Sequence, residues 1–351
     1  MNAPDISIIL PVYNAGLDFG ASLKRLERTR TDNSEIIIVD DGSNDGTAET
    51  ISEFARTRDY VFATILESNS GVAAARNVAL RQARGTYVWF VDWDDEWDEE
   101  ILRIMLARAR QSGANAVVCR SRWRLDTGID LGYTESIQGD ITQDGGYDAF
   151  DHLLLGSLKG YLWSKLLRRD LLPADMFPVM RSRSDFCGLV PVLASIGAIA
   201  FEPRTLYYHV VRSGSLTNSR EPRLDDFECC IRIVEKTAAS LPSNRKRERL
   251  VLNFVYETIS AGRVNTALRL SSPATVQREL ANASERMRFR DISRFAIVSP
   301  RTAFRCALIK IFGRHFSILR GYFVASRNLA RSVRASTGKG ADSVSKRNPS
   351  D

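Results

Sequence analysis

The chain has 351 residues, of which 44% are hydrophobic and 26% are charged, a composition typical of a globular protein rather than a disordered or fibrous one. Its five cysteines include no pair at Cys-x-x-Cys spacing, which argues against a disulfide framework and against a zinc site. The net charge of +7 suits anionic lipids or phosphorylated ligands, whereas no basic and aromatic module supports nucleic acid as a partner.

The first 120 residues alternate short β-branched runs with helical stretches, which predicts an α/β fold with a mainly parallel sheet flanked by helices. The expected strands are residues 6–10, 35–39, 60–66, 87–91, 117–119 and 199–208, and the expected helices are 20–30, 47–58, 71–84 and one that Asp98 caps and Gly113 ends. Residues 126–146 indicate a loop or an edge hairpin. Short helices are expected around residues 150–198, and the chain beyond Asp225 is expected to be helical.

Acidic side chains follow two of the predicted strands. Asp40 and Asp41 follow the strand at 35–39, and Asp92, Asp94 and Asp95 follow the strand at 87–91. Because ligands of open α/β sheets bind beyond the carboxyl ends of the strands, we expect these carboxylates to lie at one site. Crowded carboxylates repel one another, and a divalent cation is the simplest group that keeps them ionised. Oxygen ligands suit Mg²⁺ or Mn²⁺, and a nucleotide diphosphate can complete the coordination shell.

Two loops also admit a purely structural interpretation. The Asp-Gly and Asn-Asp-Gly sequences within residues 41–46 form ordinary turns, and Asp45 or Thr47 can cap the next helix. Residues 70–77 form a small-residue turn that opens a helix, where backbone amides and Arg76 suit a phosphate. Small residues also mark close packing of a helix on a sheet, so both alternatives stay open.

In their order and spacing, four segments within residues 5–217 resemble family 2 glycosyltransferases of the GT-A fold. The segments are Pro11–Asn14, Val39–Thr47, Asn69–Asn77 and Phe90–Asp95. A Rossmann-like GT-A sheet is the fold that this resemblance implies.

The resemblance also implies roles for residues at the nucleotide. Pro11 and Tyr13 would line the base pocket, Asp41 would accept a hydrogen bond from a uracil-type base, and Arg76 would approach the nucleotide. The segment Asp92-Trp93-Asp94 resembles the Asp-x-Asp element of the family. Asp94 would then bind Mn²⁺ or Mg²⁺ directly, and Asp92 would contact the ribose or a coordinated water.

An inverting reaction, as the resemblance implies, needs a carboxylate that takes the proton from the acceptor hydroxyl. Asp185 is the candidate base, because residues 183–186 match the place of the family's Glu-Asp pair, with Ser184 where the family often has Glu. A helix-capping role is the alternative for Asp185. Trp163 is a candidate for stacking on an acceptor sugar, and a core position is its alternative.

Residues 207–215 resemble an aromatic and basic segment of the family that closes over the diphosphate. Within it, Arg212 is the first candidate for contact with the diphosphate. His209 is a second candidate, as a ligand of the metal or of a phosphate, and a packed position beside two tyrosines is its alternative.

The predicted organisation is a GT-A catalytic domain at 1–220, a basic helical extension at 221–335 and a disordered tail at 336–351. Within the catalytic domain, the nucleotide-sugar half covers about 1–120 and the acceptor half about 121–220. Between Arg286 and Arg334 the sequence holds twelve Lys or Arg residues against the single Asp291. This pattern, interleaved with aromatic and aliphatic residues, suits an interfacial helix on anionic lipid, and a helical appendage with solvated arginines is the alternative.

The sequence therefore predicts an inverting transferase that moves a hexosyl group from a nucleotide diphosphate sugar to a hydroxyl of a lipid-linked oligosaccharide in polysaccharide biosynthesis. A UDP-sugar is the preferred donor. The alternatives are a soluble or protein acceptor, and a non-catalytic nucleotide-sugar-binding subunit of a membrane assembly. The start of the chain lacks a secretory signal, and no apolar run reaches the ~20 residues that cross a bilayer, so a cytoplasmic enzyme on the inner face of the cell membrane is expected.

Overall fold

A computed structural model describes residues 3–16, 18–142, 148–212 and 223–316. The contacts divide the chain into two compact units, Met1–Val255 and Tyr256–Asp351, which we describe separately. The predicted catalytic domain, residues 1–220, lies within the first unit. The predicted disordered tail at 336–351 lies outside the described residues.

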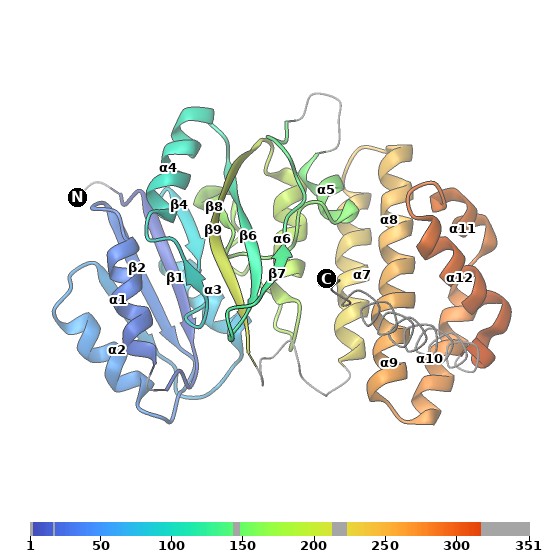
Figure 1. Cartoon of the computed structure of the whole chain (residues 1–351), viewed down its shortest axis with the longest axis horizontal. Coiled ribbons are helices and arrows are strands. Elements are labelled where there is room, and N and C mark those ends of the chain that lie inside the picture. Colours follow the sequence, from blue (N-terminus) through green and yellow to red (C-terminus); the bar gives the residue numbers. More distant parts are fainter. Residues whose placement is uncertain (1–2, 17, 143–147, 213–222, 317–351) are drawn as a thin grey trace, which may run out of the picture. The chain divides into compact units, whose positions relative to one another are not determined.

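In the described part of the first unit the core element is a nine-stranded mixed sheet with the strand order β3-β2-β1-β4-β8-β6-β9-β5, and β7 pairs with β6 (Figure 1). The strands are β1 (Ile6–Val12), β2 (Ser34–Asp40), β3 (Val61–Ile65), β4 (Tyr87–Phe90), β5 (Glu96–Trp97), β6 (Ala116–Leu125), β7 (Asp130–Tyr133), β8 (Lys165–Arg168) and β9 (Ile199–Val211). The first four strands run parallel, as predicted. Strand β8 is antiparallel to both β4 and β6, so the acceptor half of the sheet is mixed.

Helices cover the central strands, which are buried on both faces. The helices of this unit are α1 (Phe19–Thr29), α2 (Thr47–Arg56), α3 (Val72–Gln82), α4 (Ile101–Ser112), α5 (Ala149–Leu155), α6 (Ser184–Ser195), α7 (Leu224–Ala239) and α8 (Arg245–Glu257), with a short 3-10 turn η1 (Arg169–Leu171). Ile8 and Leu10 of β1 join a core cluster with Phe19 of α1 and Met105 of α4. Ile9 points to the opposite face, on which α3 packs against β1 and β2. This two-sided burial explains the continuous apolar runs in the sequence.

Two local predictions need adjustment. Asp98 does not cap α4, because the helix begins at Ile101 and Glu100 occupies the N-cap position. The Asp98 carboxylate instead accepts a hydrogen bond at 2.8 Å from the Glu100 N–H, in the turn before the helix. Gly113 ends α4 in a left-handed conformation, as predicted. Residues 126–146 contain β7, which pairs with β6, so the hairpin is the correct alternative.

The described part of the second unit consists of helices alone. They are a π-helical turn η3 (Thr258–Val264), α9 (Asn265–Leu270), α10 (Pro273–Arg286), α11 (Phe289–Phe295), α12 (Pro300–Phe312) and a 3-10 turn η4 (Gly313–His315). Ser272 and Ser299 cap α10 and α12, and each cap is followed by a proline at the first helical position. Within the ranges given above, no helix is both long enough and apolar enough to span a bilayer.

Candidate active site

The loops that follow β1 and β2 are held together by hydrogen bonds at the carboxyl edge of the sheet. The Gly16 N–H donates to Asp45 at 2.9 Å, and the Thr47 hydroxyl donates to the other oxygen of Asp45 at 2.6 Å. The Asn14 N–H donates to the Ser43 hydroxyl at 2.8 Å. The turn interpretation that the sequence left open therefore describes Asp45.

Asp41 ties the end of β2 to the start of α3. Its two carboxylate oxygens accept hydrogen bonds from the Ser70 and Gly71 N–H groups, each at 2.8 Å, and the side chain is buried. These two amides are thus already occupied, which corrects the expectation that they offer themselves to a phosphate. Pro11 is buried within β1, whereas Tyr13, just beyond the end of that strand, is 44% exposed.

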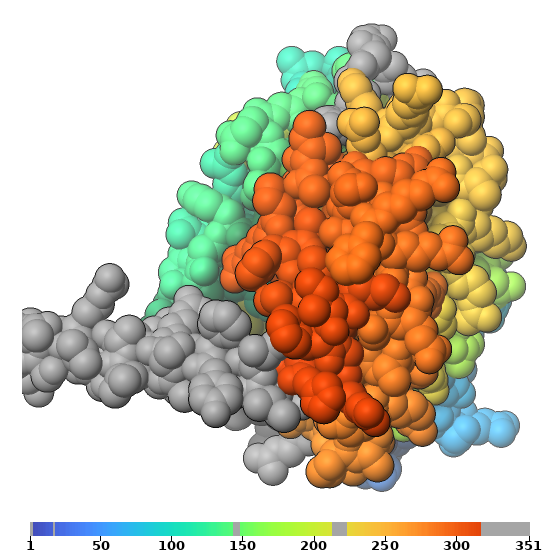
Figure 2. Space-filling model, turned by 90° about the vertical axis from the view of Figure 1, so that its right-hand side faces the viewer, coloured from blue at the N-terminus to red at the C-terminus, as the bar shows by residue number. Residues whose placement is uncertain are grey.

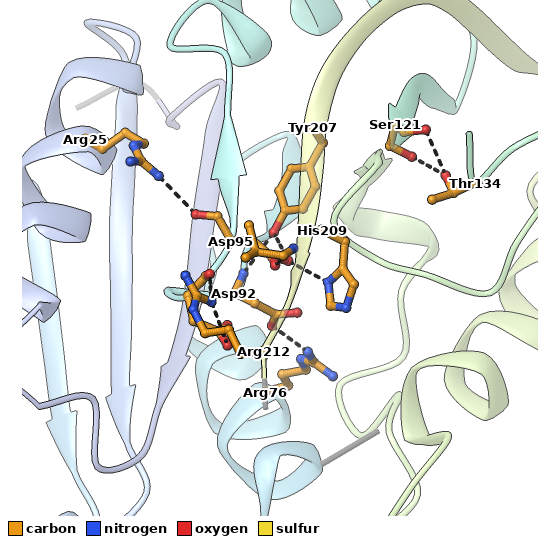
Figure 3. Close-up of polar contacts among 11 residues, drawn as sticks. Arg25, Arg76, Asp92, Asp95, Ser121, Thr134, Tyr207, His209 and Arg212 are labelled. Carbon is orange, nitrogen blue, oxygen red and sulfur yellow. Dashed lines mark hydrogen bonds and ion pairs between the residues drawn. The ribbon is translucent and has the colours of Figure 1, made fainter. Parts of the chain in front are cut away.

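Asp92 forms an ion pair with Arg76 across the end of β4. The Arg76 Nη2 lies 2.9 Å from the Asp92 Oδ1, and Arg76 projects from α3 (Figure 3). The arginine is buried, and its Nε has no hydrogen-bond partner within the part of the chain that the structure describes. A buried guanidinium with an unused donor is suited to an anionic ligand.

Asp95 anchors the acidic loop to β9. Its carboxylate accepts hydrogen bonds from the Tyr207 hydroxyl at 2.8 Å, from the His209 Nδ1 at 3.0 Å and from the Val210 N–H at 2.8 Å. Figure 3 shows Tyr207 and His209 pointing toward Asp95 from the same strand, and Arg25 of α1 donates to the Asp95 carbonyl at 3.0 Å. Asp95 is therefore a fixed point of the loop rather than a free ligand.

Asp94 has the most exposed side chain of the three aspartates in this loop, at 38% against 27% for Asp92. Its Oδ2 lies 3.3 Å from the Arg212 Nη1, and Arg212 also donates to the Asp94 carbonyl. Partial burial, together with the negative charges of Asp92 and Asp95, raises the pKa of Asp94 to about 6, against the opposing effect of Arg212. Added positive charge at this position would keep the carboxylate ionised.

The donor set around Asp94 fits a cation that shares its coordination with a ligand. Across residues 3–16, 18–142, 148–212 and 223–316, no group of three or more His, Cys, Asp or Glu side chains is arranged to hold a metal. Mg²⁺ and Mn²⁺ are commonly held by one or two carboxylates together with phosphate oxygens and water. Asp94 is the residue that would supply the protein's carboxylate to such an ion.

Asp185 lies in the first turn of α6, close enough to Arg76 and Asp92 for their charges to act on it. Burial raises the pKa of Asp185, and the Arg76 guanidinium opposes this effect. The helix-capping alternative does not describe Asp185, because Arg183 occupies the N-cap position and Asp185 accepts from the Phe186 N–H at 2.8 Å. The structure thus brings Asp185 to the same site as the acidic loop.

Trp163 belongs to the core, which corrects its candidacy as a stacking residue. The side chain is 4% exposed and stacks on Tyr161, Tyr207 and His209. His209 packs beside Trp123 as well, so the packed alternative describes its ring. Burial lowers the pKa of His209, but the hydrogen bond to Asp95 and the negative charges of Asp95, Asp92 and Asp94 together leave the pKa raised.

Two aromatic residues at the site were missed by the sequence analysis. Tyr207 donates to Asp95, and Tyr161 lies near Asp185, whose charge adds to burial in raising the pKa of Tyr161 to about 12. The spacing of Tyr207 and His209 is the signal that was available for Tyr207, because residues two apart on a strand share one face. The remainder of the segment that resembles a closing loop, residues 213–215, lies outside the described residues.

Comparison with known proteins agrees with this geometry. A family model described as "Glycosyl transferase family 2" matches residues 7–158. The chain is 29% identical over 260 residues to "Putative glycosyltransferase EpsH" of Bacillus subtilis, a match that covers 71% of this chain and 72% of the relative. It is 38% identical over 103 residues to "Putative teichuronic acid biosynthesis glycosyltransferase TuaG" of the same organism, which covers 29% of this chain and 41% of TuaG.

Solved structures share the fold over a larger part of the chain. S. aureus TarS in complex with UDP-GlcNAc matches with a TM-score of 0.66 at 19% identity and covers 88% of this chain and 91% of that chain. The mannosyltransferase PcManGT from Pyrobaculum calidifontis, in complex with GDP-Man and Mn²⁺, matches with a TM-score of 0.52 at 16% identity, covering 89% of this chain and 88% of that chain. The family match over residues 7–158, together with these relatives and structures, therefore identifies a family 2 glycosyltransferase domain with the GT-A fold within the chain.

Proposed function

We propose that the enzyme moves a hexosyl group from a nucleotide diphosphate sugar, with a UDP-sugar as the preferred donor, to an acceptor hydroxyl with inversion at the anomeric carbon. The observation that carries this proposal is the convergence of Asp92, Asp94, Arg76 and Asp185 at the carboxyl edge of the sheet. The nucleotide sugars in the TarS and PcManGT structures support the same donor class.

The nucleotide would bind along the ends of β1, β2 and β4. The exposed ring of Tyr13 is suited to the base, with Pro11 behind it in β1 and Asp41 at the end of β2. Asp41 keeps free lone pairs beyond those that accept from the backbone, so it can still accept a hydrogen bond from a uracil-type base. Asp92 and Arg76 then face the ribose and the phosphates.

Asp94 would hold Mn²⁺ or Mg²⁺ together with the diphosphate oxygens. When bound, the ion supplies a Lewis acid that stabilises the charge on the departing diphosphate. Arg212 contacts Asp94 in the structure. Its guanidinium can turn from this carboxylate to the diphosphate, because carboxylate and phosphate groups both accept paired hydrogen bonds from arginine. His209 and Trp163 would support this loop rather than touch the donor.

Asp185 would act as the general base. Its carboxylate accepts the proton of the acceptor hydroxyl while the hydroxyl oxygen attacks the anomeric carbon and the bond to the diphosphate breaks. The raised pKa favours this role, since a carboxylate with a raised pKa is a stronger base. Tyr161 is near enough to Asp185 for that charge to raise its pKa, and it would contact the acceptor.

The proposed acceptor is a lipid-linked oligosaccharide in the synthesis of a bacterial polysaccharide, at the cytoplasmic face of the cell membrane. The names of relatives such as TuaG support a role in surface polysaccharide synthesis. The C-terminal part of the chain is basic, with twelve Lys or Arg residues between Arg286 and Arg334. This composition supports an acceptor that is carried on a lipid.

Release of nucleotide diphosphate from a panel of UDP-, GDP- and dTDP-sugars tests the proposal, with a bacterial lipid extract or soluble oligosaccharides as acceptor. We expect turnover with one UDP-sugar and the lipid extract in the presence of Mn²⁺ or Mg²⁺. Turnover with soluble oligosaccharides, but not with the lipid extract, would show that the acceptor is soluble rather than lipid-linked. Absence of turnover and of nucleotide-sugar binding with every donor would contradict the proposal.

A further inference from the structure

Helix α12 of the second unit is apolar on two opposite sides. One side is buried in the helical core and includes Cys306 and Ile309. On the other side, Phe304 is 65% exposed and Ile311 is 62% exposed, with the partly buried Leu308 between them. At 3.6 residues per turn these three side chains lie within an arc of about 60°. They form a continuous apolar stripe on the outer side of the helix.

Basic side chains accompany this stripe. Residues 286–316 contain eight Lys or Arg residues and one acid, Asp291. The acid accepts a hydrogen bond from the Tyr256 hydroxyl at 3.1 Å. Arginines with exposed side chains on or beside α11 and α12 are Arg288, Arg290, Arg294, Arg301 and Arg314. Two further exposed apolar residues, Phe289 and Ile297, lie among them.

Figure 2 faces this part of the second unit, where the orange and red atoms of α10 to α12 form its surface. We call the exposed apolar residues and arginines of residues 288–314 the α11–α12 surface. Exposed aromatic and aliphatic side chains surrounded by arginines mark a contact site, because water solvates the stripe poorly while the charges remain hydrated. The combination is typical of interfacial helices, in which the apolar side chains enter the acyl boundary and the arginines contact phosphate groups.

We propose that the α11–α12 surface docks onto a bilayer that contains anionic phospholipid, with Phe304 and Ile311 inserted below the headgroups. Charge complementarity selects this occupant. Residues 317–334, which follow the surface in the chain, contain four arginines and no acid, so they carry the same sign of charge as the surface that they would cover. A second copy of the chain that docked through the same surface would oppose arginine to arginine, whereas an anionic membrane neutralises the charge.

Binding of the full chain to vesicles of phosphatidylcholine with about one third phosphatidylglycerol tests the proposal, with pure phosphatidylcholine as reference. We expect binding to the anionic vesicles that weakens with added salt. Phe304→Ser with Ile311→Ser should weaken it by about tenfold or more, because two apolar side chains no longer insert. Arg290→Gln with Arg301→Gln should weaken it by about 25-fold, at roughly fivefold for each charge lost.

Matched controls come from the first unit. Ile129→Ser with Leu131→Ser removes two side chains of similar exposure, 59% and 53%, from β7 and its turn. Arg232→Gln with Lys236→Gln removes two exposed charges from α7. Both controls should bind within about twofold of the wild type. No binding of the wild type to anionic vesicles, or equal losses in the controls and the α11–α12 variants, would overturn the proposal.

Fluorescence of a Phe304→Trp variant distinguishes the membrane from other occupants. The difference spectrum against the wild type should show emission from a solvent-exposed indole in buffer, followed by a blue shift and quenching with vesicles of dibrominated lipid. A blue-shifted emission without vesicles would mean that protein covers the stripe, and its dependence on concentration would separate a second copy from the chain's own residues. Either result contradicts the proposal. Because vesicle binding is measured without donor or acceptor, its outcome is independent of transferase activity.

Discussion

Asp185 sits where the charges of Arg76 and Asp92 reach it, although more than ninety residues of chain separate them. Burial raises the pKa of this carboxyl above its ordinary value, and only the ionised form can accept the acceptor's proton. The rate constant kcat should therefore fall as the pH decreases through the raised pKa, at a higher pH than an ordinary aspartate would give. Asp185 contributes to catalysis in this account as the base alone, so nucleotide binding should not depend on it.

Asp185→Asn should lower kcat by about 10³-fold, the usual contribution of a general base. Nucleotide affinity should stay within about twofold, since the amide keeps the size of the side chain. Steady-state kinetics measure kcat, and calorimetry measures the nucleotide affinity. The pH profile of the variant's residual activity should lack the acid limb. Asp170→Asn, which removes an exposed carboxylate paired with Arg168, is the control. A variant with unchanged kcat would remove Asp185 from the mechanism.

Tyr207→Phe tests whether the acidic loop depends on its anchor at Asp95. The variant deletes one hydroxyl and leaves the buried Asp95 with one donor fewer, which should cost about 1–3 kcal/mol of the free energy of unfolding. A less fixed loop should also raise the KM for the donor. Thermal unfolding and donor kinetics provide the readouts. Tyr208→Phe is the control, because the ring of Tyr208, which packs against the Arg124 guanidinium, is kept in this variant. It should change neither the free energy of unfolding nor the KM for the donor appreciably.

At the residue scale, sequence reasoning located side chains whose role follows from a position at the end of a strand. Asp92 and Asp94 were identified in this way, and Arg76 from the small-residue turn that opens a helix; Arg76 pairs with Asp92 in the structure. Tyr207 and Tyr161 lie far along the chain from the acidic loop. The spacing of Tyr207 and His209 places them on one face of a strand, but it does not specify that this face meets Asp95. The core position of Trp163 could not be predicted either, because its burial depends on ring contacts, such as that with Tyr207, that are distant in the sequence.

At the scale of elements, the turn between β2 and α2 depends on Gly42. Its φ of +73° is in the left-handed region, and a Cβ there would lie 2.6 Å from the backbone carbon of Ser68. No rotation of a side chain can relieve a clash with backbone. The loop that carries Asp41 is therefore packed against the segment before α3 at a distance that only glycine permits.

Gly42→Ala should destabilise the protein by at least about 2 kcal/mol and weaken nucleotide binding, because it adds a backbone clash to the strain of a positive φ. Gly46→Ala is the matched control, since Gly46 has a φ of +88° but no atom within 4 Å of the added Cβ. It should cost about 1 kcal/mol from backbone strain alone. Chemical denaturation measures both, and equal losses would show that the close approach to Ser68 does not matter.

Element prediction succeeded where apolar periodicity was strong and failed where tertiary pairing determined the structure. Strands β1, β2 and β4 are buried runs of β-branched and aromatic residues, which the sequence displays directly. Strand β6 extends to Leu125, beyond the predicted residues 117–119, although its second half is rich in arginine. Pairing with β9 along its whole length holds that half in a strand, and this partner is distant in sequence.

At the scale of the whole molecule, a buried ion pair lies in the acceptor half of the sheet. Lys165 and Glu135 are fully buried, with the Nζ 3.1 Å from the Oε1. Lys165 also donates to the Tyr161 carbonyl at 2.8 Å and to the Ser164 hydroxyl at 3.2 Å, so replacing the lysine takes a hydrogen-bond donor from three acceptors. The pair is thereby part of the structure that supports the aromatic residues near Asp185.

Lys165→Met should lower the free energy of unfolding by about 3–5 kcal/mol, because it leaves the carboxylate of Glu135 buried without its cation. Lys165→Met combined with Glu135→Gln should recover part of this loss. Arg28→Met, which breaks the exposed pair with Glu99, should cost at most about 1 kcal/mol. Denaturant titration tests this, and a loss no larger for Lys165→Met than for Arg28→Met would contradict the role of the buried pair.

The central claim is that a nucleotide diphosphate sugar binds at the carboxyl edge of the sheet with a divalent cation held by Asp94. Calorimetric titration of UDP, with and without Mn²⁺, into the wild type and Asp94→Asn tests it most directly, with Asp98→Asn as the acidic control. We predict that Mn²⁺ strengthens UDP binding by at least about tenfold in the wild type and the control, and by less than about twofold in Asp94→Asn. Failure of the wild type to bind UDP, or equal strengthening by Mn²⁺ in Asp94→Asn, would contradict the account.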